Sequence, residues 1–293
     1  MAHNIPSYLL ASGLIALGMD WVQAIMTIAL GNLLVLIPML LNSHAGTKYG
    51  IPFPVFARAS FGVFGANLAA ILRGLIACGW FGIQTWIGGQ AIFILASSVL
   101  GDSWSKAPAL WGYVAANVVS PSYDFSNAFP KLISFRLGGI ITGVIGIAIQ
   151  PWRLLANPQL YIFTWLEFYG GMLGAIAGVL VADYWLLRRT DLALADLYRT
   201  HGIYRYAAGW NWRAVASVGL GLLLAVGGAH STPGGGPFPS DGIIPFLKPL
   251  YSYSWVAGFL SALLAYYLLS VAFPVRGTAR PQPAVRTAGG SAG

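Results

Sequence analysis

Charged residues are scarce in this sequence, and cysteine is almost absent. Only 8% of the 293 residues are charged and 57% are hydrophobic, whereas an ordinary globular domain has about 25% charged residues. A soluble fold of this composition would expose mostly apolar surface, so the composition indicates a polytopic membrane protein. The single cysteine, Cys78, excludes an intrachain disulfide framework and a cysteine metal cluster, and we expect it to be a small packing residue.

The sequence also lacks the groupings that catalysis or nucleic-acid binding needs. Lys and Arg number 16 against 8 Asp and Glu, for a net charge of +8, but they are scattered through polar connections and form no basic stripe. No predicted helix pairs histidines or carboxylates, and the four histidines are dispersed. We therefore predict that the protein is not an enzyme and has no nucleic-acid partner, metal or cofactor.

Long apolar stretches make up most of the chain. Eight of them have spanning or near-spanning length and predict an all-α integral membrane protein. The first has no charged region before it and no small-residue cleavage site, so a secretory signal peptide is not predicted. The first stretch and 108–120 both look shortened. The eight stretches are 5–18, 21–42, 64–100, 108–120, 137–152, 160–187, 212–230 and 250–274.

The basic residues predict the sidedness of these segments. If the amino terminus is cytoplasmic and all eight segments cross, then 43–63, 121–136, 188–211 and the tail from 275 lie inside. Twelve Lys and Arg then lie inside or at an inner helix edge and three lie outside, as the positive-inside rule requires. The three outside are Lys106, Arg153 and Lys248. We expect a multi-pass protein with cytoplasmic termini, most simply in a bacterial inner membrane.

Two connecting segments differ in character. The 43–63 connection mixes Gly and Pro with apolar and basic residues, so we expect it to be ordered and interfacial. Lys48 and Arg58 would then meet lipid phosphates, and a gating role is the alternative. The tail 275–293 is rich in Pro, Gly, Ala and Arg, which predicts a disordered cytoplasmic segment.

An indole and an amide lie four residues apart within the third stretch. Trp80 and Gln84 should share one helix face. A glutamine at lipid depth needs hydrogen-bond partners, so it usually faces a neighbouring helix or a cavity. Together the two side chains suit a flat, amide-bearing heterocycle, and an interhelical packing contact is the alternative.

Three charged residues within or beside the apolar stretches need partners. Glu167 would be protonated, paired or at a water-filled interface; we favour the interface over a proton relay. Arg73 is expected to snorkel or to form a pair. Asp183 is interpreted as a structural anchor at the cytoplasmic edge, beside an aromatic belt.

Several motifs resemble those of the nucleobase:cation symporter-1 family, carriers of purines, pyrimidines, hydantoins and allantoin. Their number and order make the resemblance specific. They are His3-Asn4-Ile5-Pro6, the stretch 41–54, the stretch 80–90, the stretch 115–121, Ile133-Ser134-Phe135-Arg136, Gln150-Pro151-Trp152-Arg153, Ala182-Asp183-Tyr184-Trp185 and Gly209-Trp210-Asn211-Trp212.

The resemblance implies a twelve-helix fold built on a five-plus-five inverted repeat, of which this chain is an incomplete version. Residues 1–100 resemble family helices one to three, beginning within helix one. Residues 108–274 resemble helices eight to twelve, and 101–107 is the junction. Helices four to seven are missing, and an even number of missing helices leaves the sidedness downstream unchanged.

The resemblance also assigns roles to individual residues. Trp80 would stack on the substrate ring, Gln84 would bond its amide or imide edge, and Asn117 would add a polar contact from helix eight. From the residues alone, Asn117 could instead satisfy local backbone near a helix end. His3, Asn4 and Pro6 would mark a mid-membrane break in helix one, with a helix-start proline as the alternative.

A sodium site is not supported by the sequence. Sodium-coupled relatives have hydroxyl residues five and six positions before the helix-eight asparagine, where this chain has Gly112 and Trp111. Coupling to Na⁺ or H⁺ therefore stays open.

The resemblance implies membrane transport of a nucleobase or related heterocycle or ureide by cation-coupled alternating access in the complete form. The substrate would be of the uracil, cytosine, purine, hydantoin or allantoin class. A truncated, non-transporting remnant and a partner-dependent membrane subunit are the alternatives.

Overall fold

The computed structural model describes residues 5–100, 119–157, 160–233 and 236–274. Every regular element in these ranges is helical, apart from an isolated bridge between Ala207 and Trp210. Seven of the eight predicted stretches form helices, and most of 108–120 lies outside the described residues. Within the described ranges, five helices are long and apolar enough to span a membrane: Trp21–Tyr49, Ala66–Val99, Phe135–Ala156, Leu160–Leu187 and Ser254–Ala272. The all-helical membrane prediction is confirmed, with fewer full-length spans than expected.

The remaining apolar helices are shorter than the predicted stretches. The first helix has 12 residues and the helix at Trp212–Val226 has 15, whereas a span needs about 20. The elements, in chain order, are α1 (Ile5–Ala16), α2 (Trp21–Tyr49), α3 (Phe53–Phe61), α4 (Ala66–Leu100), α6 (Val119–Ala128), α7 (Phe135–Ala148), α8 (Pro151–Ala156), the π-helix η2 (Leu160–Leu166), α9 (Glu167–Val181), the π-helix η3 (Ala182–Leu187), α10 (Leu194–Leu197), η4 (Ile203–Arg205), α11 (Trp212–Val226), η5 (Pro245–Leu247), α12 (Lys248–Tyr251) and α13 (Ser254–Ala272).

The ends of α2 are fixed by local hydrogen bonds. The Asp20 carboxylate accepts from the Gln23 backbone N–H at 2.8 Å, and the Gln23 side chain accepts from the Asp20 N–H at 3.1 Å. This reciprocal capping box satisfies two backbone donors. At the other end Gly50 adopts φ 66°, a conformation that costs glycine little and other residues more.

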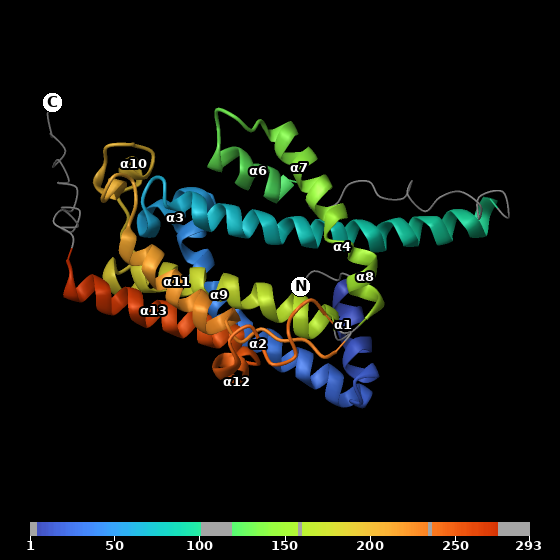
Figure 1. The fold of residues 1–293 in the computed structure, drawn as a ribbon. Helices are drawn as coiled ribbons and strands as arrows, with labels where there is room; N and C mark the ends of the chain where they lie inside the picture. The colour runs from blue at the N-terminus through green and yellow to red at the C-terminus, as the bar shows by residue number, and fades with distance from the viewer. Residues whose placement is uncertain (1–4, 101–118, 158–159, 234–235, 275–293) are drawn as a thin grey trace, which may run out of the picture.

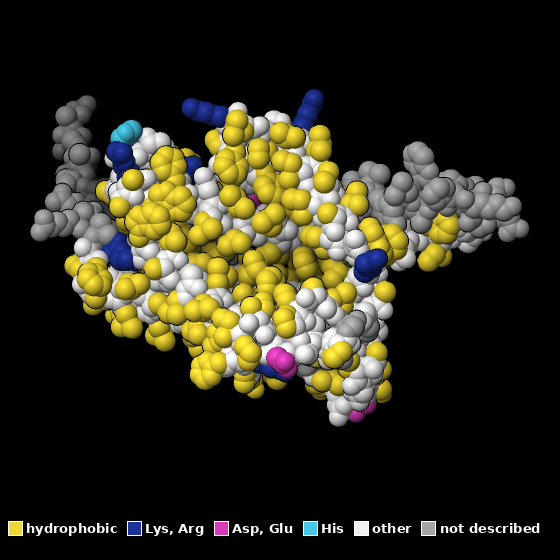
Figure 2. Space-filling view, viewed as in Figure 1, with side chains coloured by type: hydrophobic (Ala, Val, Ile, Leu, Met, Phe, Trp, Pro, Cys, Tyr) yellow, Lys and Arg dark blue, Asp and Glu magenta, His cyan; other side chains and the backbone are white. Residues whose placement is uncertain are grey.

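Most of α2 is not covered by the other described residues. Only 11% of its most apolar window is buried, and Met26, Leu33 and Ile37 are each more than 60% exposed. A helix that is apolar on all sides is stable only where lipid or other helices surround it. Within the described residues, α2 therefore presents a large surface for lipid or for additional helices. Figure 2 shows hydrophobic side chains across most of the visible face of the protein.

Two groups of helices form the body of the protein (Figure 1). One group contains α9, α11 and α13, and the other contains α4, α6 and α7. Glycines allow the close approach within each group. A Cβ atom on Gly178 of α9 would lie 2.2 Å from the Phe259 carbonyl oxygen of α13, and one on Gly82 of α4 would lie 2.4 Å from the Gly146 carbonyl oxygen of α7. Small residues at such contacts are the usual way for membrane helices to pack.

Arg73 forms an ion pair, one of the two outcomes expected for it. Its Nε lies 3.0 Å from Oδ2 of Asp124 on α6, and its guanidinium lies 4.5 Å from the centroid of the Phe53 ring. Asp124 is fully buried. Burial raises the pKa of this carboxyl, and the positive charge of Arg73 opposes the increase. The pair therefore joins α4 to α6 at the point where a lone charge would be unfavourable.

The 43–63 connection is ordered, as predicted, but it is more buried than an interfacial segment. It continues α2 to Tyr49 and then forms α3, in which seven residues are buried. Lys48 Nζ donates to the Thr190 carbonyl at 2.9 Å, and Arg58 Nη1 donates to the Leu197 carbonyl at 2.9 Å. These basic residues therefore bind the 188–199 segment of the protein, and their contact with lipid phosphates stays a prediction.

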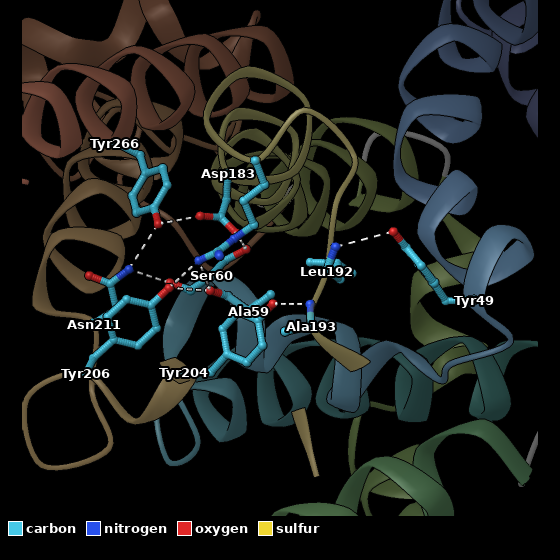
Figure 3. A network of polar contacts seen from close by, with 11 residues as sticks. Tyr49, Ala59, Ser60, Asp183, Leu192, Ala193, Tyr204, Tyr206, Asn211 and Tyr266 are labelled. Atoms are coloured by element: carbon cyan, nitrogen blue, oxygen red, sulfur yellow. Dashed lines mark hydrogen bonds and ion pairs between the residues drawn. The ribbon is translucent and has the colours of Figure 1, made fainter. Parts of the chain in front are cut away.

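A buried carboxylate joins α3 to η3 and α13. Asp183 is 2% exposed, and its Oδ2 accepts from Arg188 Nε at 2.7 Å and from Ser60 Oγ at 3.0 Å. Its Oδ1 accepts from the Tyr266 hydroxyl at 2.9 Å. Figure 3 shows these side chains converging from separate parts of the chain. Asp183 is thus a structural anchor, as predicted, but it lies inside the protein and not at an exposed edge.

The same network extends to the segment before α11. Arg188 Nη2 donates to the Ala59 carbonyl at 2.9 Å and to the Tyr206 hydroxyl at 2.6 Å. Asn211 Nδ2 donates to the Ser60 carbonyl at 2.6 Å. Burial is the largest single effect and would lower the pKa of Arg188, but the charge and hydrogen bond of Asp183 together with Tyr206 and Tyr204 outweigh it, so the pKa is raised and the guanidinium stays charged.

Replacing Asp183 tests whether this network stabilises the fold. Asp183→Asn leaves the Arg188 guanidinium buried without its counter-charge, so we expect a loss of about 3–5 kcal/mol and a clearly lower Tm of the protein in detergent. Asp191→Asn is the matched control, because Asp191 is 72% exposed and lies 3.8 Å from Lys48; its effect should be at most about 1 kcal/mol. Equal losses of stability in the two variants would contradict the anchoring role.

Candidate substrate site

Trp80 and Gln84 lie on α4, one turn apart on the same face, as predicted. Both side chains are partly buried. Ile83 and Ile87 of the same helix form a cluster against which Trp80 packs, together with Leu10 and Leu14 of α1. The pair therefore lies where α4 passes close to α1 and to the helices that follow residue 150.

Two aromatic residues of the opposite segment complete the surroundings of Trp80. The rings of Trp80 and Tyr169 meet edge to face, with centroids 6.0 Å apart and an interplanar angle of 84°. The Tyr169 ring in turn lies 5.4 Å from that of Trp165. Edge-to-face contacts at these distances are favourable. Sequence reasoning did not single out Trp165 and Tyr169 as site residues, although their spacing of four residues places them on one helix face.

The winding of the chain directs these aromatics toward α4. Trp165 lies in the π-helix η2, and Tyr169 lies in the first turn of α9. A π-helical turn holds more residues than an α-turn, and such turns occur frequently at functional sites. Gly79 makes room for the indole, because a Cβ there would lie 2.2 Å from Cη2 of Trp165. The glycine before Trp80 therefore brings α4 and η2 together at the aromatic cluster.

Two polar atoms near Gln84 are buried without a hydrogen-bond partner among the described residues. They are the indole Nε1 of Trp165 and the hydroxyl of Thr85. Leaving a buried donor unsatisfied costs about 1–3 kcal/mol, and native proteins seldom do so without a reason. Among the described residues, the Trp165 N–H is therefore a buried donor that lacks an acceptor.

The other expected site residues lie mostly outside the described ranges. Asn117, His3 and Asn4 are among them, as are Gly112 and Trp111 of the sodium-site comparison. Pro6 lies in α1 beside residues 1–4, which are outside the described ranges, so both alternatives for this proline stay predictions. Roles for Asn117 and for a break in helix one stay predictions.

Glu167 faces a separate polar cavity. The cavity has a volume of about 320 Å³, and its lining includes Glu167, Thr164, His230, Ser231 and Tyr251. Because Glu167 lines the same cavity as the polar residues of the 230–232 loop, its carboxylate need not face acyl chains. The position of Glu167 beside a cavity agrees with the predicted interfacial placement and does not test the alternative of a proton relay. Among the described residues, no group of three His, Cys, Asp or Glu could hold a metal ion.

Comparison with known proteins identifies relatives of the whole chain. A family profile described as "Permease for cytosine/purines, uracil, thiamine, allantoin" matches residues 1–114 and 108–258. The chain is 25% identical to an allantoin permease of Bacillus subtilis over 445 aligned positions, covering 93% of this chain and 88% of the relative. It is 35% identical to a hydantoin permease of Microbacterium maritypicum over 142 residues, which cover 47% of this chain and 27% of the relative.

A solved structure has the same fold. Mhp1, a nucleobase-cation-symport-1 family transporter, in a closed conformation with bromovinylhydantoin bound, superposes with a TM-score of 0.62 at 19% identity, covering 92% of this chain and 90% of that one. The predicted resemblance in fold is thereby confirmed. The family profile covers well over half of the chain, so this protein belongs to the family of permeases for cytosine/purines, uracil, thiamine and allantoin, which are transporters and not enzymes.

Proposed function

We propose that the face formed by Trp80, Gln84, Trp165 and Tyr169 is part of the site for a nucleobase or a related heterocycle or ureide. The observation that carries this proposal is the half-buried Trp80 indole, with an amide one turn away on α4 and two aromatic rings beside it. The names of the relatives support this substrate class, since they include allantoin, purine-uracil and hydantoin permeases.

Each group in this face has a defined chemical task. The flat Trp80 ring offers a stacking surface to a planar heterocycle. Gln84 presents both a donor and an acceptor, which match the alternating N–H and C=O groups of an imide edge. The Trp165 N–H, which has no partner among the residues that the structure describes, would supply a further donor. Asn117 would add a second amide from helix eight, as the family resemblance implies.

In the complete form, we propose that this site is exposed alternately to the two sides of the membrane, with a cation coupled to the movement. The fold shared with Mhp1 supports this mechanism. The chain's own residues leave the choice between Na⁺ and H⁺ open. Its orientation, with both termini cytoplasmic, rests on the distribution of basic residues.

A second candidate function is that this chain binds substrate but does not transport it without further helices. Two observations favour it. The alignment with the allantoin permease runs over 445 positions, more than the 293 residues of this chain, so parts of the relative have no counterpart here. In addition, α2 leaves most of its apolar surface uncovered. We propose that helices four to seven are missing at the 101–107 junction. Either the gene does not encode them, or a partner subunit supplies them.

Alanine substitutions test the substrate face. Trp80→Ala removes a stacking partner, and base–aromatic stacking contributes about 1–3 kcal/mol per base, so affinity should fall about 5-fold to 150-fold. Gln84→Ala should have a comparable effect through a lost hydrogen bond. The measurement is equilibrium binding of labelled uracil, cytosine, allantoin and hydantoins to detergent-purified protein. Trp21→Ala is the control, because Trp21 is 67% exposed at the start of α2. A folded wild-type protein that binds none of these compounds would contradict the substrate class.

The Trp165 N–H can be tested separately from packing. Trp165→Phe removes the donor, and replacement by 3-benzothienylalanine removes it while keeping the size of the fused rings. Because this N–H has no partner among the described residues, the second variant should keep the wild-type Tm. Its affinity for the heterocycle should fall about 5-fold to 10-fold, the loss of one hydrogen bond. Unchanged affinity would exclude a hydrogen bond from the Trp165 N–H to the substrate.

Transport and binding separate the two candidate functions. We expect the purified chain alone in liposomes to bind labelled substrate without accumulating it. Resequencing of the locus shows whether four further helices are encoded between Ala96 and Pro108. Accumulation of substrate by this chain alone would contradict the second candidate. Co-purification of a second membrane protein from native membranes would support the partner-dependent form.

A further inference from the structure

A second cavity lies at the opposite end of the α9, α11 and α13 group from the Glu167 cavity. It has a volume of about 520 Å³ and is formed by the connection before α11 together with the residue after α13. Its walls include Arg205, Trp210, Trp212, Arg213 and Phe273. None of these residues belongs to the aromatic cluster of Trp80, and nothing in the proposed transport function uses them.

The cavity lies at the level where a membrane helix ends. The spanning helix α13 ends at Ala272, and α11 begins beside it at Trp212. Arg213 Nη1 donates to the Phe273 carbonyl at 2.7 Å, so the two helix ends are in contact. Trp212 is 61% and Phe273 is 69% exposed. Exposed aromatic side chains at the ends of apolar helices lie at the height of lipid headgroups.

The charge of the cavity is positive and uncompensated. Arg205 is exposed and makes no side-chain hydrogen bond or ion pair among the described residues. Arg213 is held in place by Asn211 Oδ1, at 3.2 Å, and by the Phe273 carbonyl. No acidic residue is among the described residues that line the cavity. Two guanidinium groups without a carboxylate are suited to a phosphate, which arginine binds through paired N–H groups.

The apolar wall indicates that the phosphate belongs to a lipid. Trp210 and Trp212 stack with ring centroids 5.6 Å apart and an interplanar angle of 16°. A free phosphate would gain nothing from this exposed aromatic surface, whereas the glycerol and upper acyl carbons of a phospholipid would cover it. We propose that this cavity binds the headgroup of an anionic phospholipid, with Arg205 and Arg213 on the phosphate and the stacked tryptophans beside the glycerol region.

The test measures binding of lipids to the full-length chain in neutral detergent by native mass spectrometry. Wild-type protein should bind dioleoylphosphatidylglycerol more tightly than dioleoylphosphatidylcholine. Arg205→Gln should weaken phosphatidylglycerol binding about fivefold, the contribution of one basic residue near an anionic surface, and leave phosphatidylcholine binding unchanged. Arg205→Lys keeps the charge but not the planar guanidinium, so its affinity for phosphatidylglycerol should lie between those of the wild type and Arg205→Gln.

Arg199→Gln is the matched control. Arg199 lies on the same connection, is 70% exposed and is 3.6 Å from Asp196, and it does not line the cavity. Equal weakening in Arg199→Gln and Arg205→Gln would overturn the proposal in favour of general charge attraction. Displacement of the lipid by inorganic phosphate or glycerol 3-phosphate at similar concentrations would overturn it in favour of a free-phosphate site. Trp212→Leu should weaken lipid binding without changing the Tm, and unchanged lipid affinity in this variant would also count against the proposal.

Discussion

The ion pair between Asp183 and Arg188 is the interaction on which the arrangement of the described helices depends most. Both residues come from one short stretch at the end of the α9 region, yet their partners come from α3, α13 and the segment before α11. Removing one partner of a buried ion pair costs about 3–5 kcal/mol, because the other charge is left uncompensated. Here each oxygen of the carboxylate accepts at least one hydrogen bond, so the pair determines where α3 lies against the three-helix group.

The helices were predictable from the sequence because they depend on local apolar runs. The stretch 64–100 was expected, and α4 occupies Ala66–Leu100. The burial of α3 was not expected, since a segment with two prolines and two basic residues reads as a surface turn. Its burial depends on contacts with residues more than 100 positions away, such as that between Ser60 and Asp183. Such long-range contacts leave no periodic signal in the sequence.

The candidate site was predictable in part for the same reason. Trp80 and Gln84 lie on one helix, so their shared face follows from helical geometry. Trp165 and Tyr169 were not predicted as site residues, because their position against α4 depends on how two helices that are distant in the sequence pack together. It also depends on the small size of Gly79. The described residues thus provide one wall of aromatic and amide groups. The polar contact expected from Asn117 stays a prediction, since that residue lies outside the described ranges.

The π-helical winding of η2 has a consequence for how this segment tolerates change. A π-turn accommodates about one residue more than an α-turn, and each residue of an α-helix advances the side-chain direction by about 100°. Deleting a single residue from Leu160–Leu166 would let the segment relax to an ordinary α-helix with almost the same hydropathy. Because each residue of a π-turn rotates by less than 100°, the loss of one residue and the return to α-helical winding would nearly offset each other, and the helix before the deletion would keep about its orientation relative to α9. The segment around Trp165 would lose only its wider turn, the kind of turn that is frequent at functional sites. The wide turn of η2 is therefore a local feature that a single residue can create or remove.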